Sequence, residues 1–519
     1  MTRPHTVPKI PGILNTVRLL AVIPLLGMLM LAGAAVQADE FGDAEITLAV
    51  ADALADDKGV SGYMIDVDVD NGIVTLSGTS DNILAKERAV DITETIKGVR
   101  AVVNDIQVVP SARTDNEIRE DIETSLMLDP ATESFELETE VNDGIVTLTG
   151  VVESWQEKQL AASIAKRVEG VLDLKNRVTV DYTAERSTEE IKAEVERVLE
   201  WDALVDDALI SVSVSEDVVS LSGTVGSAAE KTRAAADAWV IGVQEVRTDN
   251  LVVESWARDE RFRKDKYVRK SDASVEEAVS EAMMYDPRVS SFEIDVSADD
   301  GVVTLEGTVD NLKAKRSAGM DARNTVGVWR VKNMIQVRPG TPSDETIEER
   351  VENALLHNPH VNRHEIDATV VNGTVYLNGR VDTYFEKAEA DDEASRVYGV
   401  VEVENNLEVT NTYDRLTYDP YVDQDWYAYD YPWYQQRDAG MATRSDWEVA
   451  SDIDDELFWS PFVDEADVNV TVEDGVATLT GTVDTWHERQ AAAENAYEAG
   501  AVAVDNNLTV EYGPRYYVP

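Results

Sequence analysis

One pattern of apolar and polar positions returns six times along the chain. Its first copy is Asp70 to Thr79, where an Asn-Gly pair is followed by alternating residues that end in Leu-x-Gly. Such a pair between alternating runs favours a tight hairpin, because Gly adopts positive φ without a Cβ clash. The predicted structural glycines are Gly72, Gly78, Gly144, Gly150, Gly223, Gly301, Gly307, Gly373, Gly379, Gly475 and Gly481. The third copy departs from the pattern, with Asp217 in place of the turn Gly.

An apolar stripe precedes every hairpin at a fixed distance. Apolar residues lie 26, 22 and 18 residues before the turn in all six copies, as Ile46, Val50 and Leu54 do in the first. This spacing puts the three side chains on one face of a helix, so each predicted helix belongs to its own hairpin. Proline lies 14 residues before the turn in four copies and is expected to end the helix. These prolines are Pro130, Pro287, Pro359 and Pro461.

A second helix and a third strand are predicted after each hairpin. In the first copy the strands span 63–69 and 73–78, the second helix 83–96 and the last strand 102–109. Asp81 is the expected N-cap of the second helix. A Gly-Val pair, here Gly98 and Val99, follows that helix and suits its C-terminal end. The predicted fold class is α+β, a tandem array of about six small αββαβ modules. Each has two helices packed on a three-stranded sheet.

The repeat period of near 70 residues predicts the domain boundaries. The predicted modules span 43–110, 114–181, 187–254, 272–338, 343–410 and 443–511, with the third divergent. A basic linker at 255–271 and a linker rich in Tyr and Trp at 411–442 separate some of them. A module of this size buries only about 60% of its unfolded surface and is marginally stable alone. We therefore expect a beaded array in which some modules pack together.

Residues 1–38 have the pattern of an export signal. A basic segment with Arg3, Lys9 and Arg18 precedes an apolar run from Leu19 to Ala35. A small-residue cleavage site, Val36-Gln37-Ala38, follows that run. An uncleaved membrane anchor is the alternative, although Pro24 interrupts the run. No cysteine follows the run, so a lipoprotein is not expected. The sequence predicts a periplasmic protein, exported through a cleaved signal peptide.

The order αββαβ and two short motifs resemble the BON domain family, named for bacterial OsmY and nodulation proteins. The motifs are D/N-G-x-V-x-L-x-G, as from Asn71 to Gly78, and G-V-x-x-V-x-N, as from Gly98 to Asn104. This resemblance covers nearly all of the chain after residue 38. It implies an exported envelope protein with roles in phospholipid or membrane-surface association, in osmotic or envelope stress, or in chaperoning of exported proteins.

The charge balance is strongly acidic, with 101 Asp and Glu against 46 Lys and Arg and a formal net charge of -55. This excess argues against a nucleic-acid partner, because phosphate contacts need a basic surface. It is typical of a surface that keeps a protein soluble in salty surroundings. The absence of Cys excludes disulfides, thiolate metal sites and a Cys nucleophile.

Two features are candidate sites for lipid or partner contact. The first is a basic island in the linker between modules three and four, consisting of Arg258, Arg261, Arg263, Lys264, Lys266, Arg269 and Lys270. Polybasic segments hold anionic headgroups, although this one could instead neutralise the acidic modules beside it. The second is the aromatic residue that opens the second helix in three modules: Trp155, Tyr384 and Trp486. These rings could be interfacial anchors or simply core residues.

Two further features have alternative interpretations. The Tyr/Trp-rich linker, from Tyr413 to Tyr434, is dense in rings that could dock on a neighbouring module, on a partner or at a headgroup region. His357, His360 and His364 have a spacing that could ligate Zn²⁺ or Ni²⁺. Pro359 breaks the predicted helix between them, and no other module repeats the trio. This metal site is therefore a weak candidate, and no cofactor is expected.

The sequence contains no catalytic motif that we recognise, so no enzyme activity is predicted. We expect a non-catalytic envelope protein that binds a phospholipid or outer-membrane surface, or exported client proteins, in osmotic or envelope stress. The alternatives are a structural spacer or matrix component, and a periplasmic chaperone without lipid binding.

Overall fold

The computed structural model describes residues 41–510 except for 110–112, 133–135, 183, 185, 259–265, 267, 291, 339, 341, 411–415, 417–418, 423–443 and 461. The predicted signal segment therefore lies outside the described residues. Among the helices in the described ranges, none combines the length and the apolar character that a membrane crossing requires.

The first helix of every module is 14 residues long and buries the predicted stripe. In the first module that stripe is Ile46, Val50 and Leu54. The six helices are α1 (Asp43–Asp56), α3 (Asp115–Leu128), α5 (Thr188–Trp201), α8 (Asp272–Tyr285), α10 (Asp344–His357) and α12 (Asp446–Trp459). The apolar spacing is therefore confirmed as a helix face in all six copies.

An antiparallel hairpin follows each of these helices. The first strands are β1 (Ile65–Asp70), β4 (Glu136–Asn142), β8 (Ile210–Ser215), β11 (Ile294–Asp299), β15 (Ile366–Val371) and β19 (Val468–Glu473). The second strands are β2 (Ile73–Ser80), β5 (Ile145–Val152), β9 (Val218–Val225), β12 (Val302–Val309), β16 (Thr374–Val381) and β20 (Val476–Val483). Buried and more exposed residues alternate along these second strands, so one face of each strand packs against the helices.

A second helix and a last strand complete each module. The helices are α2 (Ile83–Thr95), α4 (Trp155–Lys166), α6 (Ala228–Asp237), α9 (Leu312–Arg323), α11 (Tyr384–Arg396) and α13 (Trp486–Glu498). The last strand is continuous in β3 (Ala101–Val108), β10 (Glu245–Val253) and β21 (Ala503–Val510). It is interrupted in the other three modules, as β6 (Asp173–Asn176) and β7 (Thr179–Val180), β13 (Arg330–Asn333) and β14 (Gln336–Val337), and β17 (Glu402–Asn405) and β18 (Glu408–Val409).

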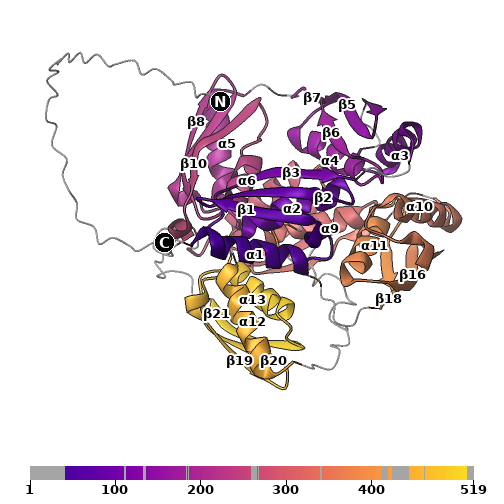
Figure 1. Ribbon diagram of the computed structural model, residues 1–519. Coiled ribbons are helices and arrows are strands. Elements are labelled where there is room, and N and C mark those ends of the chain that lie inside the picture. The colour runs from indigo at the N-terminus through magenta and orange to yellow at the C-terminus, as the bar shows by residue number, and fades with distance from the viewer. Residues whose placement is uncertain are drawn as a thin grey trace, which may run out of the picture. The chain divides into compact units, whose positions relative to one another are not determined.

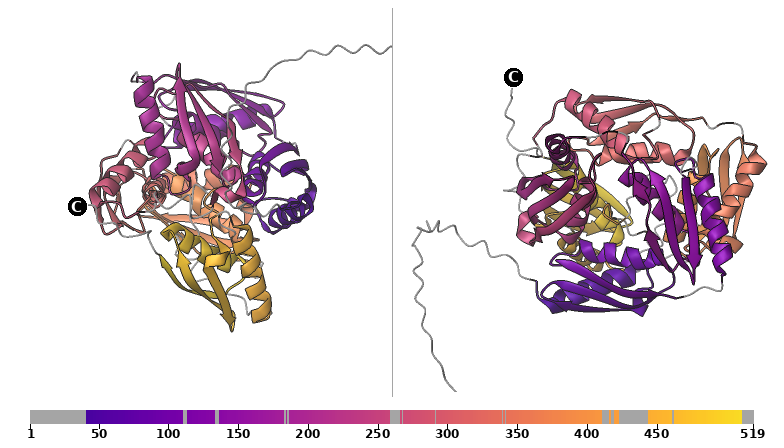
Figure 2. Two further views of the ribbon diagram at one scale, coloured as in Figure 1. Left: turned by 90° about the vertical axis from the view of Figure 1, so that its left-hand side faces the viewer. Right: turned by 90° about the horizontal axis from the view of Figure 1, so that it is seen from above.

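Each module is a two-layer unit, with both helices on one face of a three-stranded sheet (Figures 1 and 2). The second hairpin strand is central, paired antiparallel to the first strand and parallel to the last. Leu76 and its counterparts in the other five modules are almost completely buried on this central strand. The fold class is thus α+β, a tandem series of αββαβ modules, as the repeat predicted.

The hairpin turn uses left-handed backbone at two successive residues. In the first module Asn71 has φ 52° and Gly72 has φ 73°. The carboxylate of Asp43, the first residue of α1, accepts hydrogen bonds from both backbone N–H groups at 3.0 Å. Modules two, five and six repeat this two-bond clamp through Asp115, Asp344 and Asp446. The divergent third module has Thr188 at this position, and its Asp217 takes φ 63° in place of Gly.

The N-cap of the second helix was predicted one residue too early. The capping residue in the first module is Asn82 and not Asp81, and its Oδ1 accepts the N–H of Ala85 at 2.8 Å. Asn, Ser or Thr takes this position in the other five modules, and each side chain accepts an N–H three residues on. Hydroxyl and amide side chains cap as well as a carboxylate does, so residue preference alone could not decide the position.

Proline is not what sets the length of the first helix. Helices α1 and α5 have no proline after them and still span 14 residues. In both, an Asp at the C-cap accepts the N–H two residues on: Asp57 from Gly59 at 2.8 Å and Asp202 from Leu204 at 2.6 Å. Asp129, Asp286, Asn358 and Ser460 do the same in the other modules. This side-chain turn competes with helix continuation in all six modules.

A glycine-to-alanine pair tests the close approach of backbone in the hairpin. Gly78 has φ 114°, and a Cβ there would overlap the carbonyl oxygen of Met64. We expect Gly78→Ala to destabilise the first module by about 1–3 kcal/mol, the cost of one strongly strained residue. Amide hydrogen exchange of peptides from β1 and β2, followed by mass spectrometry, measures this as faster exchange.

Gly42→Ala is the matched control. Gly42 has φ -73° and its nearest neighbour to an added Cβ is 3.4 Å away, so this change should cost less than about 1 kcal/mol. Equal protection of the hairpin in both variants would contradict the steric argument.

Candidate functional site

The described residues of the basic island contact other parts of the same chain. The Arg258 guanidinium donates to the carbonyl of Ser460 at 2.8 Å, and Lys270 pairs with Glu200 at 2.9 Å. Lys266 is buried and donates to the carbonyls of Leu199 and Val205. Arg269 forms an ion pair with Asp300. Arg261, Arg263 and Lys264 lie outside the described residues. Lys266, Arg269 and Lys270 pair with carboxylates of modules three and four, and the side chain of Arg269 is 72% exposed. Headgroup contact by this segment stays a prediction.

The aromatic residues Trp155, Tyr384 and Trp486 open the second helix of their modules, as predicted. Two of them stack on a tryptophan from another module. Trp155 lies on Trp239 with ring centroids 5.4 Å apart, and Trp486 lies on Trp329 at 4.8 Å. All three are only partly exposed. Trp155 and Trp486 therefore each join two modules.

Most of the Tyr/Trp-rich linker lies outside the described residues, and Tyr421 is its one ring within them. Tyr421 is buried, stacks on Phe462 at 4.6 Å between centroids and donates its hydroxyl to the carbonyl of Leu204. The linker therefore contacts modules three and six through this ring.

The three histidines of the candidate metal site do not converge. His357 Nε2 lies 3.3 Å from the Asp121 carboxylate of module two, and His360 packs edge-on against Phe385. His364 is exposed. Burial, reinforced by Arg88 and Arg167, lowers the pKa of His360 to about 3. No group of three or more His, Asp or Glu in the described ranges has the arrangement that a metal ion requires.

Charged side chains hold the second helices of different modules together. Lys313 of α9 donates to Asp392 of α11 at 2.8 Å, and both side chains are at most 1% exposed. The second oxygen of Asp392 accepts Arg396 at 2.6 Å. Arg167, the C-cap residue of α4, pairs with Glu393 at 2.8 Å, which brings module two into the same cluster. A buried ion pair is stable only when its partners remain complete, so these contacts fix the modules against one another.

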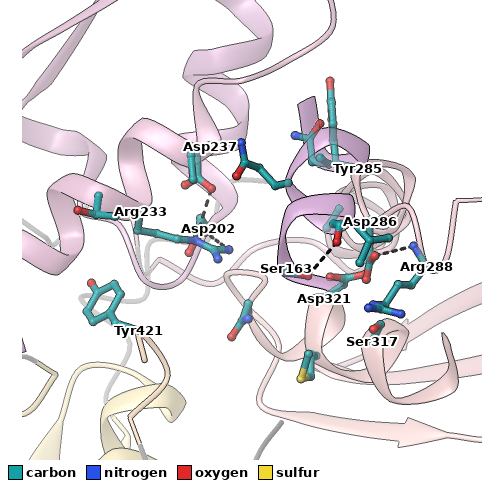
Figure 3. A pocket seen from close by; sticks show the side chains of 18 of the residues that line it. Ser163, Asp202, Arg233, Asp237, Tyr285, Asp286, Arg288, Ser317, Asp321 and Tyr421 are labelled. Atoms are coloured by element: carbon teal, nitrogen blue, oxygen red, sulfur yellow. Dashed lines mark hydrogen bonds and ion pairs between the residues drawn. The ribbon is translucent and has the colours of Figure 1, made fainter. Parts of the chain in front are cut away.

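A cavity of about 750 Å³ lies where these helices meet. Its walls come from α2, α4, α6, α9 and the ends of α5 and α8, together with Phe385 and Tyr421. Figure 3 shows Asp202, Asp237 and Arg233 on one side and Asp286 and Asp321 on another. Arg233 donates to Asp202 at 2.6 Å and lies 3.5 Å from Asp237. This cavity, built by polar groups from several modules, is the candidate functional site.

Burial keeps protons on several carboxyl groups of the cavity. Desolvation, with the charges of Glu94 and Glu87, raises the pKa of Asp91 to about 7. Desolvation and the nearby Asp202 raise the pKa of Asp237 well above its usual range, against the effect of Arg233. Desolvation and Asp286 do the same to Asp321. These acids are therefore partly neutral at the pH where ordinary aspartates are ionised.

Sequence reasoning missed this site, although a signal was present. Asp91, Asp237, Asp321 and Asp392 all lie 19 or 20 residues after the turn position, in a helix that is otherwise rich in Ala. Acids repeated at two adjacent positions of such helices indicate buried or functional carboxylates. These acids were not singled out because the chain contains 101 Asp and Glu residues.

Comparison with known proteins identifies the repeated unit. A family model described as the BON domain matches residues 42–110, 114–182, 187–255, 271–339, 343–411 and 445–512. The osmotically-inducible protein Y of Escherichia coli (strain K12) is 33% identical over 141 residues, which are 26% of this chain and 70% of that relative.

Two solved structures of CdsD, a structural protein of the Type III secretion system of Chlamydia trachomatis, are also similar. One is 15% identical, covering 36% of this chain and 85% of its own, with a TM-score of 0.11. The other, the C-terminal domain, is 13% identical, covering 41% of this chain and all of its own, with a TM-score of 0.12. At such scores nothing about function follows.

The buried ion pair between α9 and α11 can be tested by removing its cation. Lys313→Met leaves Asp392 buried with a reduced set of partners, so we expect a loss of about 2–3 kcal/mol. Hydrogen exchange should accelerate in both α9 and α11, which belong to different modules. Lys332→Met, on the exposed face of β13, removes the same charge and should leave both helices protected. If only α9 lost its protection from hydrogen exchange, the ion pair would not be joining the two modules.

The raised pKa of Asp91 predicts a pH dependence of stability. Since the carboxyl binds its proton more tightly in the folded state, its contribution is full below about pH 4 and is lost as the pH rises through about 7. Asp91→Asn should therefore gain about 2–3 kcal/mol in stability relative to the parent protein between pH 5 and pH 8. Thermal unfolding at both pH values measures this. Asp105→Asn, at an exposed residue, should show no such gain. The prediction would be refuted if the stability of Asp91→Asn changed with pH as that of the parent protein does.

Proposed function

Because the chain belongs to the BON domain family, we propose that it is an exported, non-catalytic envelope protein that binds exported client proteins during osmotic or envelope stress. The similarity to a relative whose name says that it is osmotically inducible supports the stress role. The periplasm is the proposed location, reached through the signal-like segment 1–38.

The feature that most favours client binding is an apolar side chain exposed at one repeated position. The thirteenth residue of the first helix is Met127 in α3, Met284 in α8 and Leu356 in α10. Their exposed fractions are 62%, 70% and 44%. Exposed Met adapts to partners of varied shape. Weak contacts at several modules of one chain add up by multivalency, which suits an unfolded client with many apolar segments.

A phospholipid surface is the less favoured partner. The four described cations of the basic island are engaged in internal contacts. The acidic excess of the chain repels anionic headgroups. A spacer or matrix protein without a ligand is the other alternative, and one set of assays separates the three.

The test is an aggregation assay with an unfolded outer-membrane protein, followed by light scattering, at equal amounts of client and mature chain. We expect a longer lag. The triple variant Met127→Gln, Met284→Gln, Leu356→Gln should lose at least half of that protection. Glutamine preserves helix propensity, so the fold should persist.

The control changes three exposed glutamates on the same helices: Glu120→Gln, Glu277→Gln and Glu349→Gln. It should protect as the parent does. No change in lag with the parent protein would overturn client binding. Co-sedimentation with vesicles containing anionic lipid, without any effect on aggregation, would favour the membrane, and failure in both assays would favour the spacer.

A further inference from the structure

More acidic than basic side chains line the cavity between the modules, and burial keeps several of these acids partly protonated. Nine carboxylates and five arginines line it. Some of the carboxylates are engaged, as Glu94 is by the hydroxyl of Thr232 at 2.7 Å and Glu87 by Lys166 at 2.6 Å. An excess of carboxylates in a confined space favours the entry of cations.

Two of these carboxylates have a buried oxygen with no partner within the described structure. They are Oδ2 of Asp237, at the end of α6, and Oδ2 of Asp321, in α9. The side chain of Asp237 is only 9% exposed. Both residues line the cavity (Figure 3). A buried acceptor without a donor costs about 1–3 kcal/mol, so a ligand that donates hydrogen bonds here would stabilise the protein.

The free acceptors are not grouped for a single metal ion. They come from different modules, and no set of three acidic or histidine side chains in the described ranges is arranged to coordinate one. Figure 3 shows Asp237 and Asp321 on different sides of the cavity, so a ligand that satisfies both must reach across it and carry a donor at each end. Ammonium groups supply both positive charge and hydrogen-bond donors.

We propose that this cavity binds a linear aliphatic polyamine, with separate ammonium groups on the Asp237 and Asp321 carboxylates. The walls between them suit the methylene chain, because Val198, Val240 and Met320 contribute apolar surface. Trp155 and Trp201 also line the cavity, and their rings can attract an ammonium group. The volume of about 750 Å³ exceeds what such a chain occupies, so water would share the space.

The route to the cavity is open at its rim. Thr232 is exposed, and the side chain of Glu87 is 41% exposed.

The acids inside the cavity also link ligand binding to the release of protons. The pKa of Asp237 depends on the charges of Asp202, Arg233 and Lys266. The pKa of Asp321 depends on those of Asp286 and Arg233. A polyamine that pairs with ionised carboxylates should displace the protons that burial keeps on them.

Isothermal titration of the mature chain with spermidine at pH 7 and moderate salt tests the proposal. We expect one saturable site per chain, with net proton release seen as a heat that depends on the ionisation enthalpy of the buffer. The double variant Asp237→Asn, Asp321→Asn should weaken binding at least tenfold. Asn resembles the protonated acid in shape and charge, so the variant should fold, and thermal unfolding checks this.

The matched control is Asp295→Asn, Asp299→Asn, which removes two charges from the exposed face of β11 in module four. It should bind spermidine as the parent does. Equal weakening by the control, or many weak sites per chain, would reduce the effect to counterion attraction by an acidic surface and overturn the proposal. Tighter binding of Mg²⁺ than of spermidine, lost in the same double variant, would also overturn it.

Discussion

The close approach of two backbone segments in the hairpin is the constraint on which every module depends. The glycine two residues after the buried Leu of the central strand lies opposite the start of strand one, as Gly78 lies opposite Ile65 and Gly150 opposite Leu137. A side chain at this glycine would overlap the carbonyl of the residue before that partner. The register is therefore fixed, and with it the face on which Leu76 meets the helices. Six copies of the contact give six equivalent cores.

The cores and the joints between modules follow different chemistry. Within a module, the contacts are those of an apolar helix face on a sheet, as between Val50 and Leu76 in one cluster. Between modules, apolar contacts such as Ile83 of module one in the core of module two are joined by ion pairs, stacked tryptophans and shared backbone bonds. One such bond runs from Glu169 of module two to the carbonyl of His357 in module five. The free energy of apolar contacts does not depend on pH, whereas that of contacts made by buried carboxylates does. The arrangement of modules should therefore respond to solution conditions more than their folds do.

This division bears on how a protein of repeated BON modules acts. The outer sheet faces and helix ends, with Met127 and Met284, are repeated and separate, which suits weak multivalent contacts with large partners. The second helices turn inward and enclose polar groups from several modules, which suits one small polar ligand. In the described part of the chain, repeated apolar residues thus lie exposed on the modules, and a cavity lined by several modules lies between them.

The sequence by itself determined the module: the turn, the helix stripe and the strand order all follow from local spacing, because each is settled within about 70 residues. It misplaced the N-cap at Asp81 by one residue, since neighbouring polar residues can all accept the capping bond. Only the tertiary structure decided which helices meet. The pairs Lys313 with Asp392 and Trp155 with Trp239 join residues about 80 positions apart. No periodicity connects such residues, because their contact depends on how folded modules pack and not on the folding of any one of them.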